Sequence, residues 1–361
     1  MYLLKKLTRN YIHILLVISF LQTLHAQEQK ISIDSSLISK REINIVGVGD
    51  IMLGTAYPSR LYLPPNEDCK PLLEEVKPYL LEADISFANL EGALVDGGKM
   101  SKNCSDTLKC YAFRMPEKFA SCLSESGFDI LSLANNHSGD FGDNGRERTM
   151  QILDSLHIDY AGLQIKPSAE FTKDGIKYGF IAFAPNKGTL DLVHIKGAAK
   201  MVKELSERND IVIVSFHGGA EGKGYQHLTK STEEFYGENR GNVYEFSHQM
   251  IDAGADIIFG HGPHVTRAME IYNDRFIAYS LGNFSTYGRF NLRGPNGIAP
   301  LVQLVTDEKG KFIRGKIIPI YQSGEGGAKI DPYKRVIGVI NKLNASDLPE
   351  NCLFINSKGE F

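Results

Sequence analysis

The chain has 361 residues, enough to bury a full core in one large α/β domain or two small ones. Its formal charge is −3 at pH 7 and becomes about −6 without the first 26 residues, which excludes the basic surface of a nucleic-acid-binding protein. Its composition is that of an ordinary globular protein, with no repeat or low-complexity tract.

Residues 1–26 have the layout of a secretory signal peptide. Three basic residues precede a mostly apolar stretch over 11–24, and polar residues follow Ala26. We expect cleavage after Ala26, export to the periplasm or cell surface, and a linker over 27–42. The alternative is that the segment stays uncleaved and anchors the protein, although its apolar stretch is short for a membrane span.

Five cysteines follow this segment, and an oxidising compartment would allow them to form disulfide bonds. Cys104 and Cys110 bracket a short polar loop, and we expect a disulfide there. Cys69 with Cys122 is the second candidate pair. The alternative is that all five are unpaired small apolar residues.

The apolar periodicity predicts short buried strands alternating with helices, which indicates an α/β fold. Strands are expected at 43–48, 84–88, 129–133, 159–162, 178–183, 210–216 and 256–259, followed by a meander over 265–272, 276–280 and 301–306. Helices are expected at 71–81, 116–126, 143–156, 198–208 and 242–253.

Two stretches lack a clear period, and we expect both to lie beside the site. Residues 96–111 are polar and should form an excursion on its rim, and residues 223–241 should cover one side of it. After residue 322 the pattern weakens at a glycine-rich hinge over 324–327. We therefore expect one domain over 43–322 and a C-terminal segment over 323–361.

Polar side chains follow five of the predicted strands at their carboxyl ends. In open α/β sheets that edge is where ligands bind. The set provides several histidines, an anionic oxygen ligand and an amide oxygen, as a two-metal hydrolytic site requires, and a further imidazole to protonate a leaving group. The residues are Asp50, Asn89 with Glu91, Asn136 with His137, His217, and His261 with His264.

Six blocks containing these residues resemble the bacterial CapA capsule-synthesis family, also called the poly-γ-glutamate capsule family. In order they read GVGDIMLG, FANLEGAL, LANNHSGDFGDNG, FHGG, GADIIFGHGPHV and IAYSLGNF, and they span about residues 43 to 290. That family is similar to calcineurin-like metallophosphoesterases. The resemblance therefore implies a four-layer α/β/β/α sandwich of metallophosphoesterase type, with metals at the strand ends.

The resemblance also implies a role for each residue. His137 would be the catalytic acid, while Asn89, Glu221 and Asn283 would contact substrate or support the ligands. The cofactor would be one or two divalent ions, with no choice made among Mn, Zn, Fe and Mg. The metal ligands would be Asp50, Glu91, Asn136, His217, His261 and His264.

Two positions depart from the metallophosphoesterase pattern. Met52 stands where a histidine is usual, and a thioether does not replace an imidazole for such an ion. Asn89 and Glu91 stand where a second aspartate is usual, so a single ion, or a weakly held second one, is an alternative.

A purely structural role is the alternative for each candidate residue. Asp50 and Asn89 could cap backbone N–H groups in loops. Glu91 could pair with a lysine on the rim, and His137 could be a structural histidine.

We therefore expect an exported metal-dependent hydrolase, phosphoesterase-like or directed at γ-glutamyl amide or ester bonds. Its partner would be an anionic envelope or extracellular polymer or its precursor, together with membrane-bound capsule machinery and without nucleic acid. The alternative is a non-catalytic component that binds such a polymer during export, and Met52 favours it. A family name alone does not decide between them.

Overall fold

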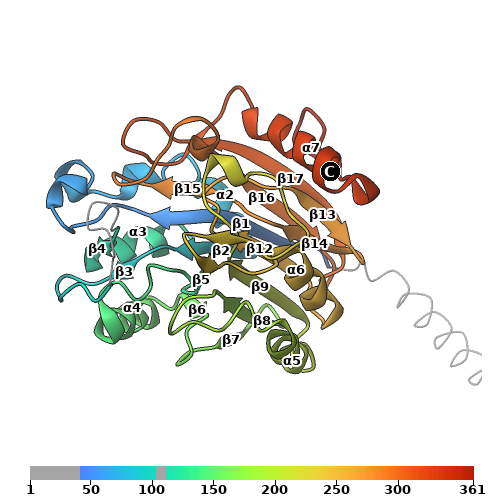
Figure 1. Cartoon of the computed structure of the whole chain (residues 1–361), viewed down its shortest axis with the longest axis horizontal. Coiled ribbons are helices and arrows are strands. Elements are labelled where there is room, and N and C mark those ends of the chain that lie inside the picture. Colours follow the sequence, from blue (N-terminus) through green and yellow to red (C-terminus); the bar gives the residue numbers. More distant parts are fainter. Residues whose placement is uncertain (1–40, 103–110) are drawn as a thin grey trace, which may run out of the picture. The chain divides into compact units, whose positions relative to one another are not determined.

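The computed structural model describes residues 41–102 and 111–361, and residues 42–361 form one compact unit. Two β-sheets lie face to face in it, with helices on their outer faces (Figure 1). The predicted signal peptide and the Cys104–Cys110 pair lie outside the described residues.

The first sheet is built around β1, and its parallel strands end at one edge. β1 runs parallel to β2, β2 to β5 and β5 to β6, whereas β16 runs antiparallel to β1. β15 (Asn283–Thr286) pairs with the carboxyl end of β1. In order across the sheet, the other strands are β18 (Lys329–Ile330), β17 (Phe312–Tyr321), β16 (Ile298–Thr306), β1 (Ile43–Met52), β2 (Ile85–Leu90), β5 (Ile130–Ser132) and β6 (Asp159–Ala161).

The second sheet is also mostly parallel at its centre, where β8, β9, β12 and β14 share one direction. In order across it, the strands are β13 (Met269–Tyr272), β14 (Arg275–Ala278), β12 (Ile257–His261), β9 (Ile211–His217), β8 (Ile176–Phe183) and β7 (Ser168–Lys173). Two short pairs lie outside both sheets: β3 (Ala93–Leu94) with β4 (Arg114–Met115), and β10 (Glu234–Phe235) with β11 (Glu238–Asn239).

Helices cover the outer face of each sheet, which gives four layers. The predicted α/β/β/α sandwich is therefore confirmed. One apolar cluster lies between the first sheet and its helices, one between the sheets, and one between the second sheet and its helices. The first set of helices is α2 (Lys77–Leu81), α3 (Ala120–Glu125) and α4 (Gly142–Ser155); the second is α5 (Ile195–Ser206) and α6 (Val243–Asp252).

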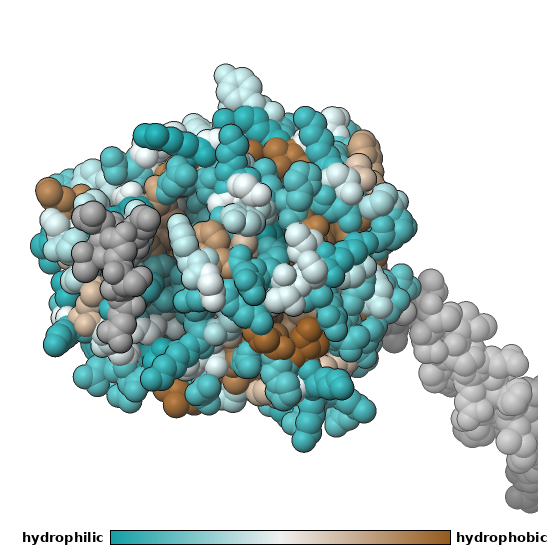
Figure 2. All heavy atoms as spheres, viewed as in Figure 1, coloured by the Kyte–Doolittle hydropathy of each residue, from teal (hydrophilic) through white to brown (hydrophobic). Residues whose placement is uncertain are grey.

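The central strands are continuous apolar runs because both of their faces are buried. In β1, Ile45 faces the other sheet and Val46 faces the helices. In β9, Ile213 faces the first sheet and Val214 faces the helices of the second sheet. By contrast, the molecular face in Figure 2 consists mostly of hydrophilic residues. No helix within 41–102 or 111–361 has the length and apolar content needed to cross a bilayer.

The two sheets approach closely at a glycine. A Cβ atom at Gly47 would lie 2.3 Å from the ring of Phe259, so only glycine fits between β1 and β12 at this point. The ring of Phe259 also stacks on Phe87 of β2, with centroids 4.9 Å apart. This contact lies three residues before Asp50 and two residues before His261.

The predicted helix over 71–81 is wrong in its extent. Only Lys77–Leu81 is α-helical, and a separate 3-10 turn spans Lys70–Leu72. Pro78 lies in the first turn of α2, where its missing N–H is tolerated, but in the interior of a longer helix it would remove a backbone hydrogen bond.

The C-terminal region has more regular structure than its pattern suggested. α7 (Arg335–Asp347) packs against β16 and β17, and buries Val336, Ile340 and Leu343. These three residues have helical spacing, but Gly338 and several β-branched residues have poor helix propensity and obscured the signal. β17 was missed as well, because Pro319 interrupts its pattern.

The second candidate disulfide is confirmed, since Cys69 and Cys122 are bonded. Both cysteines are 3% exposed and belong to the cluster between the first sheet and its helices. Cys352 is free and exposed.

Removing this disulfide should destabilise the domain. The bond joins positions 53 residues apart, and closing a loop of that size in the unfolded chain stabilises the folded state by about 2–4 kcal/mol. The Cys69→Ala/Cys122→Ala variant should therefore unfold at lower guanidinium concentration than the wild type. Cys352→Ala is the control and should not shift the midpoint; equal midpoints for all three proteins would contradict the expectation.

Candidate metal centre

The candidate site begins at the carboxyl end of β1. Strand register places Asp50 beside Asn89 of β2 on one side and Asn283 of β15 on the other. The amide nitrogen of Asn89 donates to Asp50 Oδ1 at 2.9 Å. All three side chains are at most 1% exposed.

Two histidines from the second sheet meet the same carboxylate. His261 Nδ1 lies 3.1 Å from Asp50 Oδ1, and His264 Nδ1 lies 2.9 Å from Asp50 Oδ2. Burial alone would raise the pKa of Asp50, but the hydrogen bonds from both imidazoles outweigh it and hold that pKa far below its usual value. Asp50 is therefore an anion that joins the two sheets.

Strand register also sets His217, at the end of β9, directly beside His261, at the end of β12. His217 is fully buried, and burial together with the nearby Arg240 cation lowers its pKa well below the usual value. It is therefore a neutral imidazole with a free lone pair, the form that binds metals.

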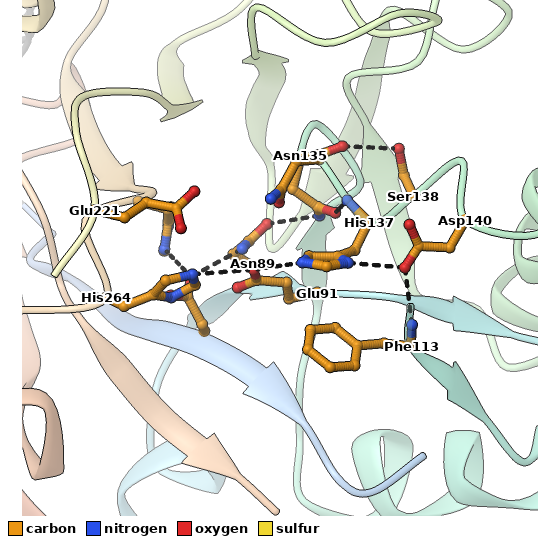
Figure 3. Close-up of polar contacts among 12 residues, drawn as sticks. Asn89, Glu91, Phe113, Asn135, His137, Ser138, Asp140, Glu221 and His264 are labelled. Carbon is orange, nitrogen blue, oxygen red and sulfur yellow. Dashed lines mark hydrogen bonds and ion pairs between the residues drawn. The ribbon is translucent and has the colours of Figure 1, made fainter. Parts of the chain in front are cut away.

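Glu91 completes the cluster from just beyond β2. Its Oε1 lies 3.5 Å from His264 Nε2 and 3.8 Å from His137 Nε2 (Figure 3). Burial, and then the charge of Asp50, raise the pKa of Glu91 well above its usual value despite the opposing effect of His264. Burial lowers the pKa of His264, but the Glu91 and Asp50 carboxylates outweigh it and raise that pKa to about 10.

Several buried atoms of the cluster have no hydrogen-bond partner. Such atoms cost free energy unless something else satisfies them. Ligand atoms of Asp50, Glu91 and His217 lie within 4.8 Å of one another. Carboxylate, imidazole and amide donors suit a divalent ion, so the residues present fit one. The unpartnered atoms are both carboxylate oxygens of Glu91, both ring nitrogens of His217, His261 Nε2 and Asn136 Oδ1.

The backbone holds His264 in an unusual conformation. Its φ angle of 56° lies in the left-handed region, which is unfavourable for a residue other than glycine. Amide groups of Asn283 and Asn296 donate to its carbonyl oxygen at 3.3 and 3.1 Å. Asn283 therefore supports the position of His264 from below the turn.

His137 approaches Glu91 from the loop after β5. In Figure 3 its imidazole lies between Asp140 on one side and Glu91 with His264 on the other. His137 Nδ1 is 2.8 Å from Asp140 Oδ2, and the Phe113 ring packs against the imidazole at 4.2 Å. Burial lowers the pKa of His137, and the attraction of Asp140 only partly offsets this.

Three residues that the sequence did not identify as site residues fix this loop. Asn135 donates to Asn89 Oδ1 at 3.1 Å and accepts from the His137 backbone N–H at 3.0 Å. Lys102 Nζ lies 3.3 Å from Asp140 Oδ1 and from His137 Nδ1. Asn135 and Asp140 stand within the LANNHSGD block, whereas Lys102 belongs to the polar stretch 96–111, which was expected on the rim of the site.

Glu221 and Met52 lie at the margins of the cluster. Glu221 Oε1 accepts from Arg240 at 2.6 Å on the rim, and it does not bond to the other predicted site residues. Met52 is fully buried in the apolar cluster beneath the helices. The position that resembles a metal histidine is therefore part of the core.

A sequence model of a known protein family matches most of this chain. The model described as bacterial capsule synthesis protein PGA_cap matches residues 44–287, well over half of the chain. The chain belongs to this family. The expected membership of the CapA capsule-synthesis family is thus confirmed.

Two curated CapA proteins are similar to this chain. The capsule biosynthesis protein CapA of Bacillus anthracis is 28% identical over 262 residues, covering 67% of this chain and 59% of that protein. The PGA biosynthesis protein CapA of Bacillus subtilis is 28% identical over 253 residues, covering 66% of this chain and 61% of that protein. The chain thus spans about six tenths of the length of these relatives.

A purple acid phosphatase from yellow lupin seeds is a structural neighbour of this PGA_cap protein. The sequence identity is 12% and the TM-score is 0.40, and the match covers 83% of this chain and 55% of that one.

Metal binding should release protons and strengthen as pH rises. Without metal, the pKa of His264 is about 10, so its imidazole holds a proton at neutral pH that a bound ion would displace. Calorimetric titration with Zn²⁺ or Mn²⁺ in buffers of different ionisation enthalpy measures this release. Equal affinity at about pH 6 and pH 8, with no released proton, would contradict the assignment.

Proposed function

We propose that this protein is an exported, metal-dependent hydrolase that acts on an anionic envelope polymer or its precursor. The single observation that most supports it is the buried cluster at the strand ends. There, Glu91, His217 and His261 present possible ligand atoms that make no hydrogen bond within the described residues. A purely structural core would not leave so many such atoms unpaired.

The reaction class follows from the donors and from His137. A divalent ion held by Asp50, Glu91, His217, His261, His264 and Asn136 would polarise a phosphoryl or acyl oxygen and activate water. Asp140 accepts a hydrogen bond from His137 Nδ1–H, so Nε2, the nitrogen that faces Glu91, is the atom that would take up and release a proton. His137 would deliver this proton to the leaving group.

The surroundings of His137 support this role. The rings of Phe113 and Phe290 stack with centroids 5.0 Å apart, Phe113 against His137 and Phe290 5.5 Å from His264. These rings limit the access of water from one side. On the other side, Asn135 holds the backbone of His137, and Lys102 holds Asp140, the partner of the imidazole.

Capsule synthesis, the role of the family, motivates the choice of an anionic polymer as substrate. Both phosphodiester bonds and γ-glutamyl amide or ester bonds have a central atom whose oxygen a metal could polarise. We propose that membrane-bound capsule machinery delivers the polymer or its precursor to the site.

Export is supported by the amino-terminal sequence and by the disulfide. Cys69 and Cys122 form a disulfide, and structural disulfides are typical of oxidising compartments such as the periplasm or cell surface. We expect the sequence read from the amino terminus of the mature protein to begin after Ala26. A mature protein that starts at Met1 would instead indicate an uncleaved anchor.

One observation favours the second candidate, a non-catalytic polymer-binding component. Met52 contributes to the core and not to the ligand set, so the cluster has fewer donors than a two-metal site usually has. Tight polymer binding without turnover, in protein loaded with metal, would select this alternative.

Replacing His137 should lower turnover strongly but leave metal binding nearly intact. General acid catalysis contributes roughly 10²–10⁴-fold, so His137→Ala should lower kcat by that factor towards generic phosphodiesters or γ-glutamyl amides. His217→Ala should instead lose the metal, because it removes a buried donor. Activity and metal content are measured on the same samples.

His227→Ala is the matched control, because the His227 side chain is 72% exposed and bonds to Asp347, outside the cluster. It should change neither quantity. Wild-type activity in His137→Ala, together with wild-type protein that takes up no metal, would refute the hydrolase.

A further inference from the structure

A cavity of about 340 Å³ lies next to the metal centre, beyond the loop of His137. Lys102 and Asn136 line it, and both also contribute to that loop: Lys102 contacts His137 Nδ1 and the Asn136 carbonyl oxygen. The rest of the wall comes from the start of α4 and from the turn after β8, where Arg146 and Lys187 stand. The cavity therefore opens beside the proposed reaction centre.

The charges around this cavity leave an excess of positive charge. Three cations line it, Lys102, Arg146 and Lys187, against two carboxylates. Asp140 is engaged by His137 and Lys102, and Asp143 by Arg146 at 2.8 Å. Lys187 has no ion pair among the described residues. The amino-terminal end of α4 adds partial positive charge.

Arg146 is held in a fixed position. Its Nη2 donates to the Lys187 carbonyl oxygen and its Nη1 to Asp143, both at 2.8 Å. A Cβ atom at Gly139 would lie 2.3 Å from Nη2, and one at Gly188 would lie 2.8 Å from Cζ. The guanidinium thus lies between two glycines, where a side chain on either would displace it.

Arg146 also has unused hydrogen-bonding capacity. A guanidinium has five N–H donors, and the described contacts use one on each terminal nitrogen. The arginine side chain is only 14% exposed, so these donors are poorly reached by bulk water. A fixed, partly desolvated guanidinium with spare donors is suited to a carboxylate or phosphate, whose oxygens match its planar geometry.

We propose that this cavity is a subsite for an anionic group of the substrate, bound by Arg146 with Lys187 and Lys102, while the adjoining bond lies at the metal centre. This inference rests on the proposed function, because it assumes that the substrate reaches both places. The shared chemistry is a carboxylate or a phosphoryl group one repeat away from the reacting bond. A polyanionic chain supplies such a group at every repeat, whereas a small neutral ester does not.

The subsite is tested by binding, without turnover, so that failure of the hydrolase does not affect the readout. Metal-free protein is titrated with a γ-linked tri-glutamate and, separately, with inorganic phosphate. Arg146→Gln should weaken binding roughly tenfold to a hundredfold, as expected for losing hydrogen bonds to a charged group. Lys187→Gln removes a charge without removing an internal hydrogen bond, and should weaken binding in the same direction.

Arg148→Gln is the matched control. Arg148 lies on the same helix, but its side chain is 45% exposed and bonds to Glu117 outside the cavity. It should leave binding unchanged, and thermal unfolding of each variant verifies the fold. In active protein, Arg146→Gln should raise KM for a polyanionic substrate and leave kcat nearly unchanged.

The outcomes separate the two sources of the anionic group. Tri-glutamate binding that falls in Arg146→Gln and Lys187→Gln, but not in Arg148→Gln, supports a subsite for a carboxylate. The same pattern with phosphate alone supports a subsite for a phosphoryl group. Equal binding by the wild type and both cavity variants, or no binding of either probe to the wild type, overturns the proposal.

Discussion

The carboxylate of Asp50 is the interaction on which the site depends. It stands at the end of β1 in the first sheet and accepts hydrogen bonds from His261 and His264, which belong to the second. This link is available only because Gly47 and Phe259 let the two sheets approach just before their strands end. Two further ligands are then placed by strand register or by one contact, His217 beside His261 and Glu91 against His264, and Asn89 is placed beside Asp50.

The core strands could be predicted because burial on both faces removes the alternation of polar and apolar residues and leaves short continuous apolar runs. The same reasoning located the polar residues at the strand ends, since parallel strands deliver their carboxyl ends to one edge. It failed where local pattern and tertiary packing disagree. Pro78 shortened a helix that apolar spacing alone would extend, while Gly338 and Pro319 concealed α7 and β17, which packing against the sheets stabilises.

The supporting contacts of the site were less accessible to sequence reasoning. Lys102 lies in the polar stretch 96–111 and belongs to no motif, so its contacts with Asp140 and His137 could not be predicted. The cavity shows the same limit more clearly, because its cations come from three separate segments and none of them belongs to a recognisable motif. Only the glycines at 139 and 188 mark the space that Arg146 occupies, and loops use glycine so often for its backbone freedom that neither position stands out in the sequence.

The unpartnered donors and the left-handed backbone of His264 also have a thermodynamic consequence. Both cost free energy in the metal-free folded chain and nothing in the unfolded one, so this part of the molecule reduces stability on its own. An ion that satisfies these donors would bind the folded state alone and add stability in proportion to the logarithm of its concentration. Folding of the domain would then be linked to the supply of metal around it, and the metal centre would belong to the fold as much as to the chemistry.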